Sequence, residues 1–193
     1  MKIKKSELLK DPKKVAKNLL GATLCSRVGG KLCSGRIVEL ELYIGECDKA
    51  CHAWRGKTPR NAVMFGAPGK AYVYFVYGMH NMLNVVISEA GKANAILIRA
   101  VEPLDGIETM QARRGIKDAK NLCNGPAKLT KAFGITTKHN GADLSGDLIW
   151  LEPATSRFQV ATGKRIGVDY AGSDADLPWR FVIKGNKFVS KPI

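Results

Sequence analysis

Residues 33–45 read CSGRIVELELYIG, a stretch whose alternation of side chains predicts a β-strand. Successive side chains of a strand point to opposite faces of its sheet. The apolar face takes Val38, Leu40, Leu42 and Ile44, and the second face takes Ile37, Glu39, Glu41 and Tyr43. The pattern therefore predicts a strand that carries two carboxylates on one face.

Further strands are predicted on the C-terminal side of this stretch. AYVYFVY (71–77) and MLNVVIS (82–88) are typical of a hairpin joined at residues 78–81, and AILIRAVEP (95–103) is typical of another strand. Shorter strands are expected in DLIWLE (147–152), RIGVDYAG (165–172) and WRFVIKG (179–185).

Helices are predicted over 11–21, 105–114 and 126–133. Asp11 can cap the first of these, Pro12 suits its first turn, and Gly21 can adopt the left-handed conformation that closes it. Strands and helices together indicate the α+β class. We expect one compact domain over residues 1–193, with a mixed, largely antiparallel sheet, a protruding β-hairpin and flanking helices.

The chain carries 31 Lys and Arg against 17 Asp and Glu, a formal net charge of +14 over 193 residues. This excess favours an anionic partner such as nucleic acid, a membrane surface or an acidic substrate. Residues 1–20 lack the apolar region of a signal peptide, and no stretch approaches the ~20 apolar residues of a membrane span. Five scattered cysteines favour a reducing compartment over a disulfide scaffold. We therefore expect an intracellular protein that does not bind membranes.

Arg99 lies in the apolar run ILIRAV, where a buried guanidinium needs an anionic partner. Glu39 and Glu41, on one face of their strand, are the candidates. A carboxylate held by such an arginine stays oriented and ionised, which suits the activation of water or the stabilisation of a cation. The alternative is a structural ion pair that joins two strands, and the spacing alone does not separate the two.

Four of the five tyrosines, at 43, 72, 74 and 77, lie within a short stretch of chain, with His52 between them. They could form an aromatic pocket for a flat ring, and aromatic side chains on a basic surface are typical of nucleic-acid binding. The alternative is that they are ordinary strand residues, which we favour for Tyr72. Tyr77 and Met79 flank Gly78 at the hairpin tip, so we expect them to be exposed and to act as a wedge in a duplex.

Other sequence motifs are excluded or weak. The spacing of Cys47, Cys51 and His52 is not that of a zinc site, and neither a nucleophile elbow nor a phosphate-binding loop is present. The helix that begins at NGPAKL (124–129) could bind a phosphate through its free N–H groups and Lys128. We expect no metal and no cofactor.

Five segments occur in an order that is similar to the alkyladenine (3-methyladenine, methylpurine) DNA glycosylase family. The resemblance extends from about Leu19 to the end of the chain. Its segments are VELELYIG (38–45), HAWRGKTPRNAVMF (52–65), YVYFVYGMHNMLNVV (72–86), ILIRAVEP (96–103) and NGPAKL (124–129).

The resemblance implies roles for individual residues. Glu41 would be the catalytic group that positions and deprotonates water, with Arg99 as its partner and the backbone carbonyl of Val168 as a further water ligand. Tyr43, His52 and Tyr74 would wall the pocket for a flipped base, and Asn84 would screen purines by their exocyclic groups. The DNA contacts expected are intercalation by Tyr77 and Met79 and phosphate binding by Arg60 and Lys128.

The resemblance also implies an activity, that of a monofunctional DNA glycosylase of base excision repair. Such an enzyme flips a damaged purine, alkylated or deaminated, out of duplex DNA and hydrolyses its N-glycosidic bond with an activated water, leaving an abasic site. Its partner would be double-stranded DNA that contains damaged purines, and we expect a DNA-associated monomer. A non-enzymatic nucleic-acid-binding module and a small-molecule nucleosidase are the competing hypotheses, and the nucleosidase has no need of the +14 charge.

Overall fold

A computed structural model describes all residues, 1–193, and the long strand β2 (Cys33–Ile44) is its centre. β5 (Asn94–Pro103) pairs with β2 along one edge. On the other edge β1 (Thr23–Ser26) pairs with the first part of β2, and β8 (Arg180–Ile183) pairs with Glu39–Glu41. The predicted strand is thus confirmed, and it has neighbours on both edges.

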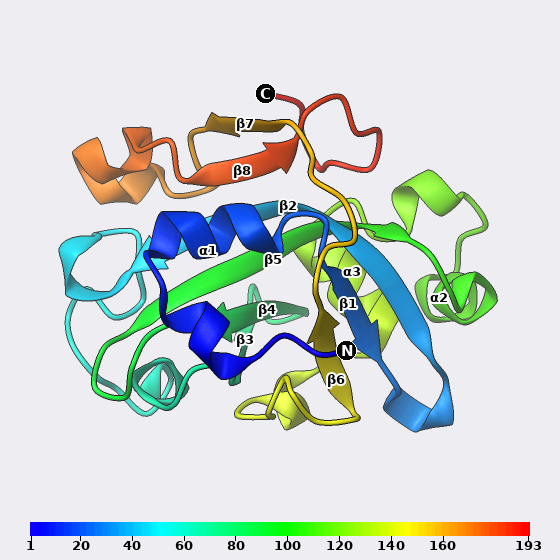
Figure 1. Cartoon of the computed structure of the whole chain (residues 1–193), viewed down its shortest axis with the longest axis horizontal. Coiled ribbons are helices and arrows are strands. Elements are labelled where there is room, and N and C mark those ends of the chain that lie inside the picture. The colour runs from blue at the N-terminus through cyan, green and yellow to red at the C-terminus, as the bar shows by residue number, and fades with distance from the viewer.

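The remaining strands extend this sheet, and every strand pair is antiparallel. The main order is β3-β4-β5-β2-β1-β6, with β7 attached beyond β8. Figure 1 shows β7 and β8 along one side of the molecule, above β2. The added strands are β3 (Ala71–Val76), β4 (His80–Val86), β6 (Ile149–Glu152) and β7 (Val160–Gly163).

The three predicted α-helices are confirmed as α1 (Pro12–Leu19), α2 (Ile107–Arg114) and α3 (Pro126–Phe133). The Asp11 side chain accepts a hydrogen bond of 2.9 Å from the Lys14 N–H, as expected of a cap. Figure 1 shows α1 in front of β2, which it contacts, whereas α3 packs against β4 and β5. Short 3-10 helices are η1 (Lys5–Leu9), η2 (Val28–Gly30), η3 (Gly45–Cys47), η4 (Ala62–Phe65), η5 (Ala119–Asn121), η6 (Thr137–His139) and η7 (Asp169–Asp176).

Two expectations need correction. Residues 165–172 do not form a strand: Gly167 and Gly172 have positive φ angles of 74° and 61°, which extended backbone does not allow, and η7 begins at Asp169. The strict alternation along β2 is also wrong at its centre. A register shift between Ile37 and Glu39 lets neighbouring Ile37 and Val38 both enter the main core.

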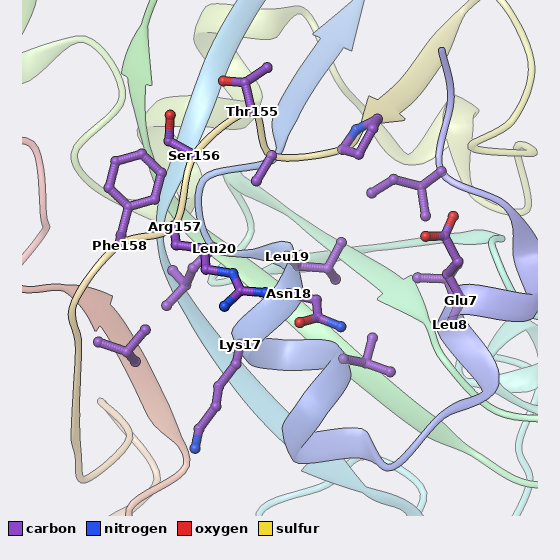
Figure 2. A pocket seen from close by; sticks show the side chains of 15 residues that line it. Glu7, Leu8, Lys17, Asn18, Leu19, Leu20, Thr155, Ser156, Arg157 and Phe158 are labelled. Carbon is purple, nitrogen blue, oxygen red and sulfur yellow. The ribbon is translucent and has the colours of Figure 1, made fainter.

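The core is one large cluster of buried side chains that joins the helices to the sheet, and a smaller cluster lies around Tyr72 and Met64. No helix of the structure is both long and apolar enough to cross a bilayer. A cavity of about 690 Å³ lies between α1 and residues 153–158. Figure 2 shows its lining, which includes none of the predicted site residues.

Candidate active site

The second cavity, about 360 Å³, contains most of the predicted site residues. It lies among β2, β3, β4, β5 and the segment 166–170. Predicted residues on its wall are Tyr43, His52, Tyr74, Tyr77, Asn84, Arg99 and Val168. The strand pairing explains this convergence, because β5 sets Leu97 opposite both Glu41 of β2 and Asn84 of β4.

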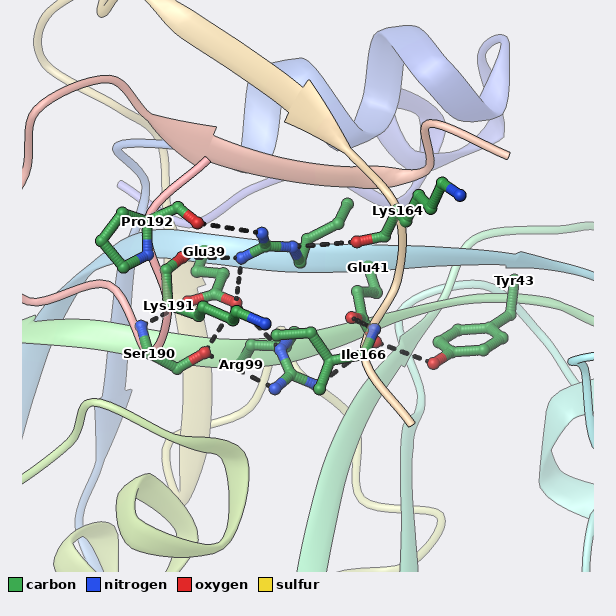
Figure 3. Close-up of polar contacts among 10 residues, drawn as sticks. Glu39, Glu41, Tyr43, Arg99, Lys164, Ile166, Ser190, Lys191 and Pro192 are labelled. Carbon is green, nitrogen blue, oxygen red and sulfur yellow. Dashed lines mark hydrogen bonds and ion pairs between the residues drawn. The ribbon is translucent and has the colours of Figure 1, made fainter. Parts of the chain in front are cut away.

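Glu41 lies immediately behind the wall of this cavity and is fully buried. Three neighbours that line the cavity contact its carboxylate. Tyr43 Oη donates to Oε2 at 2.8 Å, the Ile166 N–H donates to Oε1 at 2.7 Å, and Arg99 Nη1 lies 3.4 Å from Oε2 (Figure 3). Burial raises the pKa of Glu41 above its usual value, and Arg99 and the two hydrogen bonds only partly oppose this.

Arg99 joins both predicted carboxylates, as expected. Its Nε donates to Glu39 Oε1 at 2.9 Å, while Nη1 faces Glu41. Arg99 thus forms an ion pair with each glutamate across the two strands, and Glu41 also contacts Tyr43 and Ile166 of the cavity wall.

The predicted base-binding residues form an aromatic wall. The His52 ring meets the edge of the Tyr74 ring at 4.5 Å between centroids, and His52 Nδ1 lies 2.9 Å from Tyr72 Oη. Partial burial of the imidazole, with a smaller contribution from Arg60, lowers the pKa of His52 to about 4. The imidazole is therefore neutral at physiological pH and can either donate or accept a hydrogen bond.

Asn84 lies on the cavity wall and is 4% exposed. Its Nδ2 donates to the Tyr72 carbonyl at 3.1 Å, which fixes the plane of the amide. Its Oδ1 forms no hydrogen bond within the protein, so it is free to meet a polar group in the cavity. Val168 also lines the cavity, and its carbonyl accepts a hydrogen bond from the Ala171 N–H at 2.9 Å. One lone pair of that carbonyl remains for another donor.

The hairpin tip has the expected exposure. Tyr77 is 83% exposed and Met79 68% exposed, although Tyr77 also reaches the cavity wall. β3 ends at Val76, one residue earlier than predicted, and β4 begins at His80, two residues earlier than predicted, so only residues 77–79 form the turn. Tyr77 has a φ of 54° and Gly78 a φ of 67°, so a tight left-handed turn presents the tyrosine.

The predicted phosphate-binding residues lie on two sides of this region. The Arg60 guanidinium lies 5.5 Å from the Tyr74 ring centroid, and its Nη2 donates to the Phe75 carbonyl at 3.4 Å. Lys128 Nζ donates to Asn124 Oδ1 at 2.8 Å. Pro126, the first residue of α3, lines the cavity, so this helix begins at the cavity edge. Both phosphate-binding roles stay predictions.

Sequence reasoning missed several residues of the site. Tyr72, which we assigned to ordinary strand packing, is 1% exposed and still lines the cavity. Tyr170 is a 71% exposed aromatic residue at the cavity wall, and its hydroxyl donates to the Ala50 carbonyl at 3.1 Å. Tyr170 was missed because residues 165–172 were predicted to form a strand. Tyr72 could have been found, because alternation in AYVYFVY places it on the same face as Tyr74.

Arg165 is a further buried cation that no sequence pattern indicated. It forms two hydrogen bonds with Asp48, of 2.5 and 2.8 Å, and one of 3.0 Å with the Leu42 carbonyl. Its guanidinium lies 4.8 Å from the ring centroid of Tyr43 and 5.1 Å from that of Trp179. The Arg165 guanidinium therefore packs against the ring of Tyr43, whose hydroxyl donates a hydrogen bond to Glu41.

The structure contains no group of three or more His, Cys, Asp or Glu residues that could hold a metal ion. All five cysteines are free, and burial raises the pKa of Cys51 to about 11. Cys51 is thus a protonated thiol beneath the aromatic wall.

The sequence of this chain matches a known protein family. The family model described as methylpurine-DNA glycosylase (MPG) matches residues 6–187. The chain is a member of the methylpurine-DNA glycosylase family. The match covers every strand of the sheet and all three α-helices.

Relatives of this methylpurine-DNA glycosylase are similar over nearly their full length. A protein of Rhodopseudomonas palustris (strain BisB18) is 48% identical over 191 residues, which are 99% of this chain and 92% of the relative. A protein of Carboxydothermus hydrogenoformans is 51% identical over 181 residues, 92% of each chain. Both are named "Putative 3-methyladenine DNA glycosylase". The resemblance found in the sequence is confirmed, and the chain is a DNA glycosylase, a hydrolase of N-glycosyl bonds.

Proposed function

We propose that this methylpurine-DNA glycosylase excises alkylated or deaminated purines, 3-methyladenine among them, from duplex DNA and leaves an abasic site. The single observation that carries the proposal is a buried, arginine-paired carboxylate directly behind an aromatic cavity. A protein that only bound DNA would gain nothing from a carboxylate beside its anionic ligand. The net charge of +14 disfavours a small-molecule nucleosidase, because binding of a free nucleoside does not require an excess of positive charge.

The chemistry that we assign to Glu41 is the activation of water. As the bond between C1′ and the purine nitrogen breaks, the electron pair leaves with the base and the sugar gains oxocarbenium character, as in glycoside hydrolysis. The carboxylate stabilises this cation and takes a proton from the water whose oxygen bonds to C1′. Arg99 and the free lone pair of the Val168 carbonyl would hold that water. Burial raises the pKa of Glu41 from its usual acidic value toward neutral pH, and a pKa closer to the working pH suits a general base.

The cavity wall would select the base. An alkylated purine carries positive charge and leaves readily, and neutral His52 with the rings of Tyr43 and Tyr74 offers flat π surfaces on which it can stack. The unpartnered Oδ1 of Asn84 would test the exocyclic groups of the purine. A damaged base flips more readily because it pairs less well, which adds to selectivity.

The hairpin tip and the basic residues would act on the duplex. We propose that Tyr77, with Met79, fills the space from which the base is removed and so offsets part of the lost stacking. Arg60 and Lys128 would bind phosphates on either side. We further propose that the enzyme works as a DNA-associated monomer inside the cell, without a metal or cofactor.

Single-turnover base release tests the proposal, with duplexes that contain one hypoxanthine or one ethenoadenine and with bulk methylated DNA. We expect release by the wild type and its loss in Glu41→Gln, with equal or tighter binding of DNA by the variant. Tight, salt-sensitive binding without release from any substrate would instead support a binding module. Release that persists in Glu41→Gln would refute the role of this carboxylate.

A further inference from the structure

Glu39, the second carboxylate of the active-site cluster, receives more donors than any other acidic side chain of that cluster. It is fully buried. Arg99 Nε, Arg180 Nη1 and Ser190 Oγ lie 2.9, 3.2 and 2.8 Å from Oε1, and the Ser190 N–H donates to Oε2 at 2.5 Å. Two of its four donors therefore come from a single residue near the end of the chain.

The segment Ser190–Pro192 is fastened to the same cluster by its backbone. Arg180 donates to the Lys191 carbonyl at 2.8 Å and to the Pro192 carbonyl at 3.4 Å. Figure 3 shows Ser190, Lys191 and Pro192 beside Glu39, with Arg99 between Glu39 and Glu41. The segment lies beyond the residues that the family model matches, 6–187.

The geometry makes Arg99 a shared cation. Its Nε serves Glu39, its Nη1 faces Glu41, and its Nη2 lies 3.5 Å from Ser190 Oγ. A buried carboxylate that loses a donor is left with an unmet demand for hydrogen bonds. Without Ser190, Arg99 would be drawn toward Glu39 and away from Glu41.

We propose that the segment Ser190–Pro192 is a positioning element of the active site, in which Ser190 saturates Glu39 and thereby holds Arg99 against Glu41. This inference rests on the proposed role of Glu41. A purely structural role, in which the segment only fastens the end of the chain, predicts lower stability but no change in the titration of Glu41.

The titration of Glu41 depends on every charged or titratable group around it. Those groups are Glu39 and Tyr43 on β2, Tyr74 on β3, Arg99 on β5, Arg180 on β8 and Arg165 in the segment before η7. Of these, Glu39, Arg99 and Arg180 are linked to Ser190–Pro192, and of these three only Arg99 also pairs with the Glu41 carboxylate. Loss of Ser190 therefore acts on Glu41 through Arg99, whose positive charge favours the ionised carboxylate.

The test measures the pH dependence of single-turnover excision at saturating enzyme for Ser190→Ala, Ser190→Thr and a chain that ends at Val189. The acid limb is the low-pH part of the pH–rate profile, where the rate rises as Glu41 ionises. We expect Ser190→Ala to shift this limb to higher pH by roughly half to one pH unit, so that the rate at a pH below the limb falls about three- to tenfold. The plateau rate should stay within about twofold of the wild type. Ser190→Thr keeps the hydroxyl and should restore the wild-type limb, whereas the shortened chain should shift further.

A matched control and a readout without activity complete the experiment. Lys187→Ala removes an exposed side chain three residues before Ser190 that does not contact the cluster, and it should leave the limb in place. Titration of the Glu41 side-chain carboxyl by 13C NMR in the free protein should show the same upward shift in Ser190→Ala. Unchanged NMR titration, or a fall in rate that is uniform across pH, would overturn the inference. Excision that survives Glu41→Gln would refute the proposed role of Glu41 in catalysis, whereas the 13C titration tests separately whether Ser190 holds Arg99 against Glu41.

Discussion

Replacement of Arg99 by alanine tests the electrostatic description of the site most directly. Arg99 is 7% exposed as a whole residue and pairs with two fully buried carboxylates. Glu39 keeps Arg180 and Ser190 in the variant, but Glu41 keeps only the Tyr43 hydroxyl and the Ile166 N–H. Glu41 is thus the group that loses its only cation within ion-pair distance.

The magnitude follows from this difference. Breaking a buried ion pair from one side costs roughly 3–5 kcal/mol, which for a chain of this size lowers Tm by roughly 6–20 °C. The cost depends on pH because Glu41 can bind a proton instead. Burial already raises the pKa of Glu41 in the folded state above the usual value of a glutamate, and loss of Arg99 raises it further. The folded state then binds the proton more tightly than the unfolded state, so stability falls as pH increases above 4.5.

Urea denaturation of the wild type and Arg99→Ala at pH 5 and pH 8 measures this. We expect the difference in unfolding free energy to be clearly larger at pH 8. The double variant Arg99→Ala, Glu41→Gln removes the stranded charge and should be more stable than Arg99→Ala at pH 8. An equal loss at both pH values, together with no recovery in the double variant, would show that Arg99 acts through packing and not through Glu41.

Three other predictions concern residues that we propose to contact the DNA or the flipped base. Tyr77→Ala should weaken binding to lesion-containing duplex but change the unfolding free energy by no more than about 0.5 kcal/mol, because the side chain is 83% exposed; a large fall in Tm would contradict this. His52 should stay neutral between pH 8 and pH 5, because burial lowers its pKa to about 4. NMR titration of its ring carbons measures this, and a transition above pH 5 would show that the burial argument is wrong. Arg60→Ala and Lys128→Ala should each reduce the slope of log binding constant against log salt by about one, and an unchanged slope would remove that residue from the phosphate contacts.

The sequence allowed much of this arrangement to be predicted because the relevant signals are local. Alternation in ELELY placed Glu39, Glu41 and Tyr43 on one face, and an arginine among apolar residues indicated a partner for them. The exposed hairpin tip could also be predicted from a local signal, because Tyr77 and Met79 are unusual residues for a turn.

The parts that escaped prediction depend on contacts between distant segments. Residues 165–172 have the alternation of a strand, but Gly167 and Gly172 turn the backbone so that the Ile166 N–H meets Glu41 instead of a strand partner. Asp48 and Arg165 are 117 positions apart, and Glu39 and Ser190 are 151 apart. No periodicity relates such pairs, and only the assembled sheet brings them together.

The pairing of β8 with β2 has a consequence for synthesis of the chain. The edge of β2 at Glu39–Glu41 is covered by residues 180–183, so it stays open while the intervening chain emerges from the ribosome. At about 5–20 residues per second, the 151 positions from Glu39 to Ser190 take roughly 8–30 s. An open edge invites pairing with other chains, and charged side chains that point inward are a known defence. We expect the two charged glutamates of this edge to oppose such pairing until β8 covers it and Arg180 and Ser190 bind Glu39.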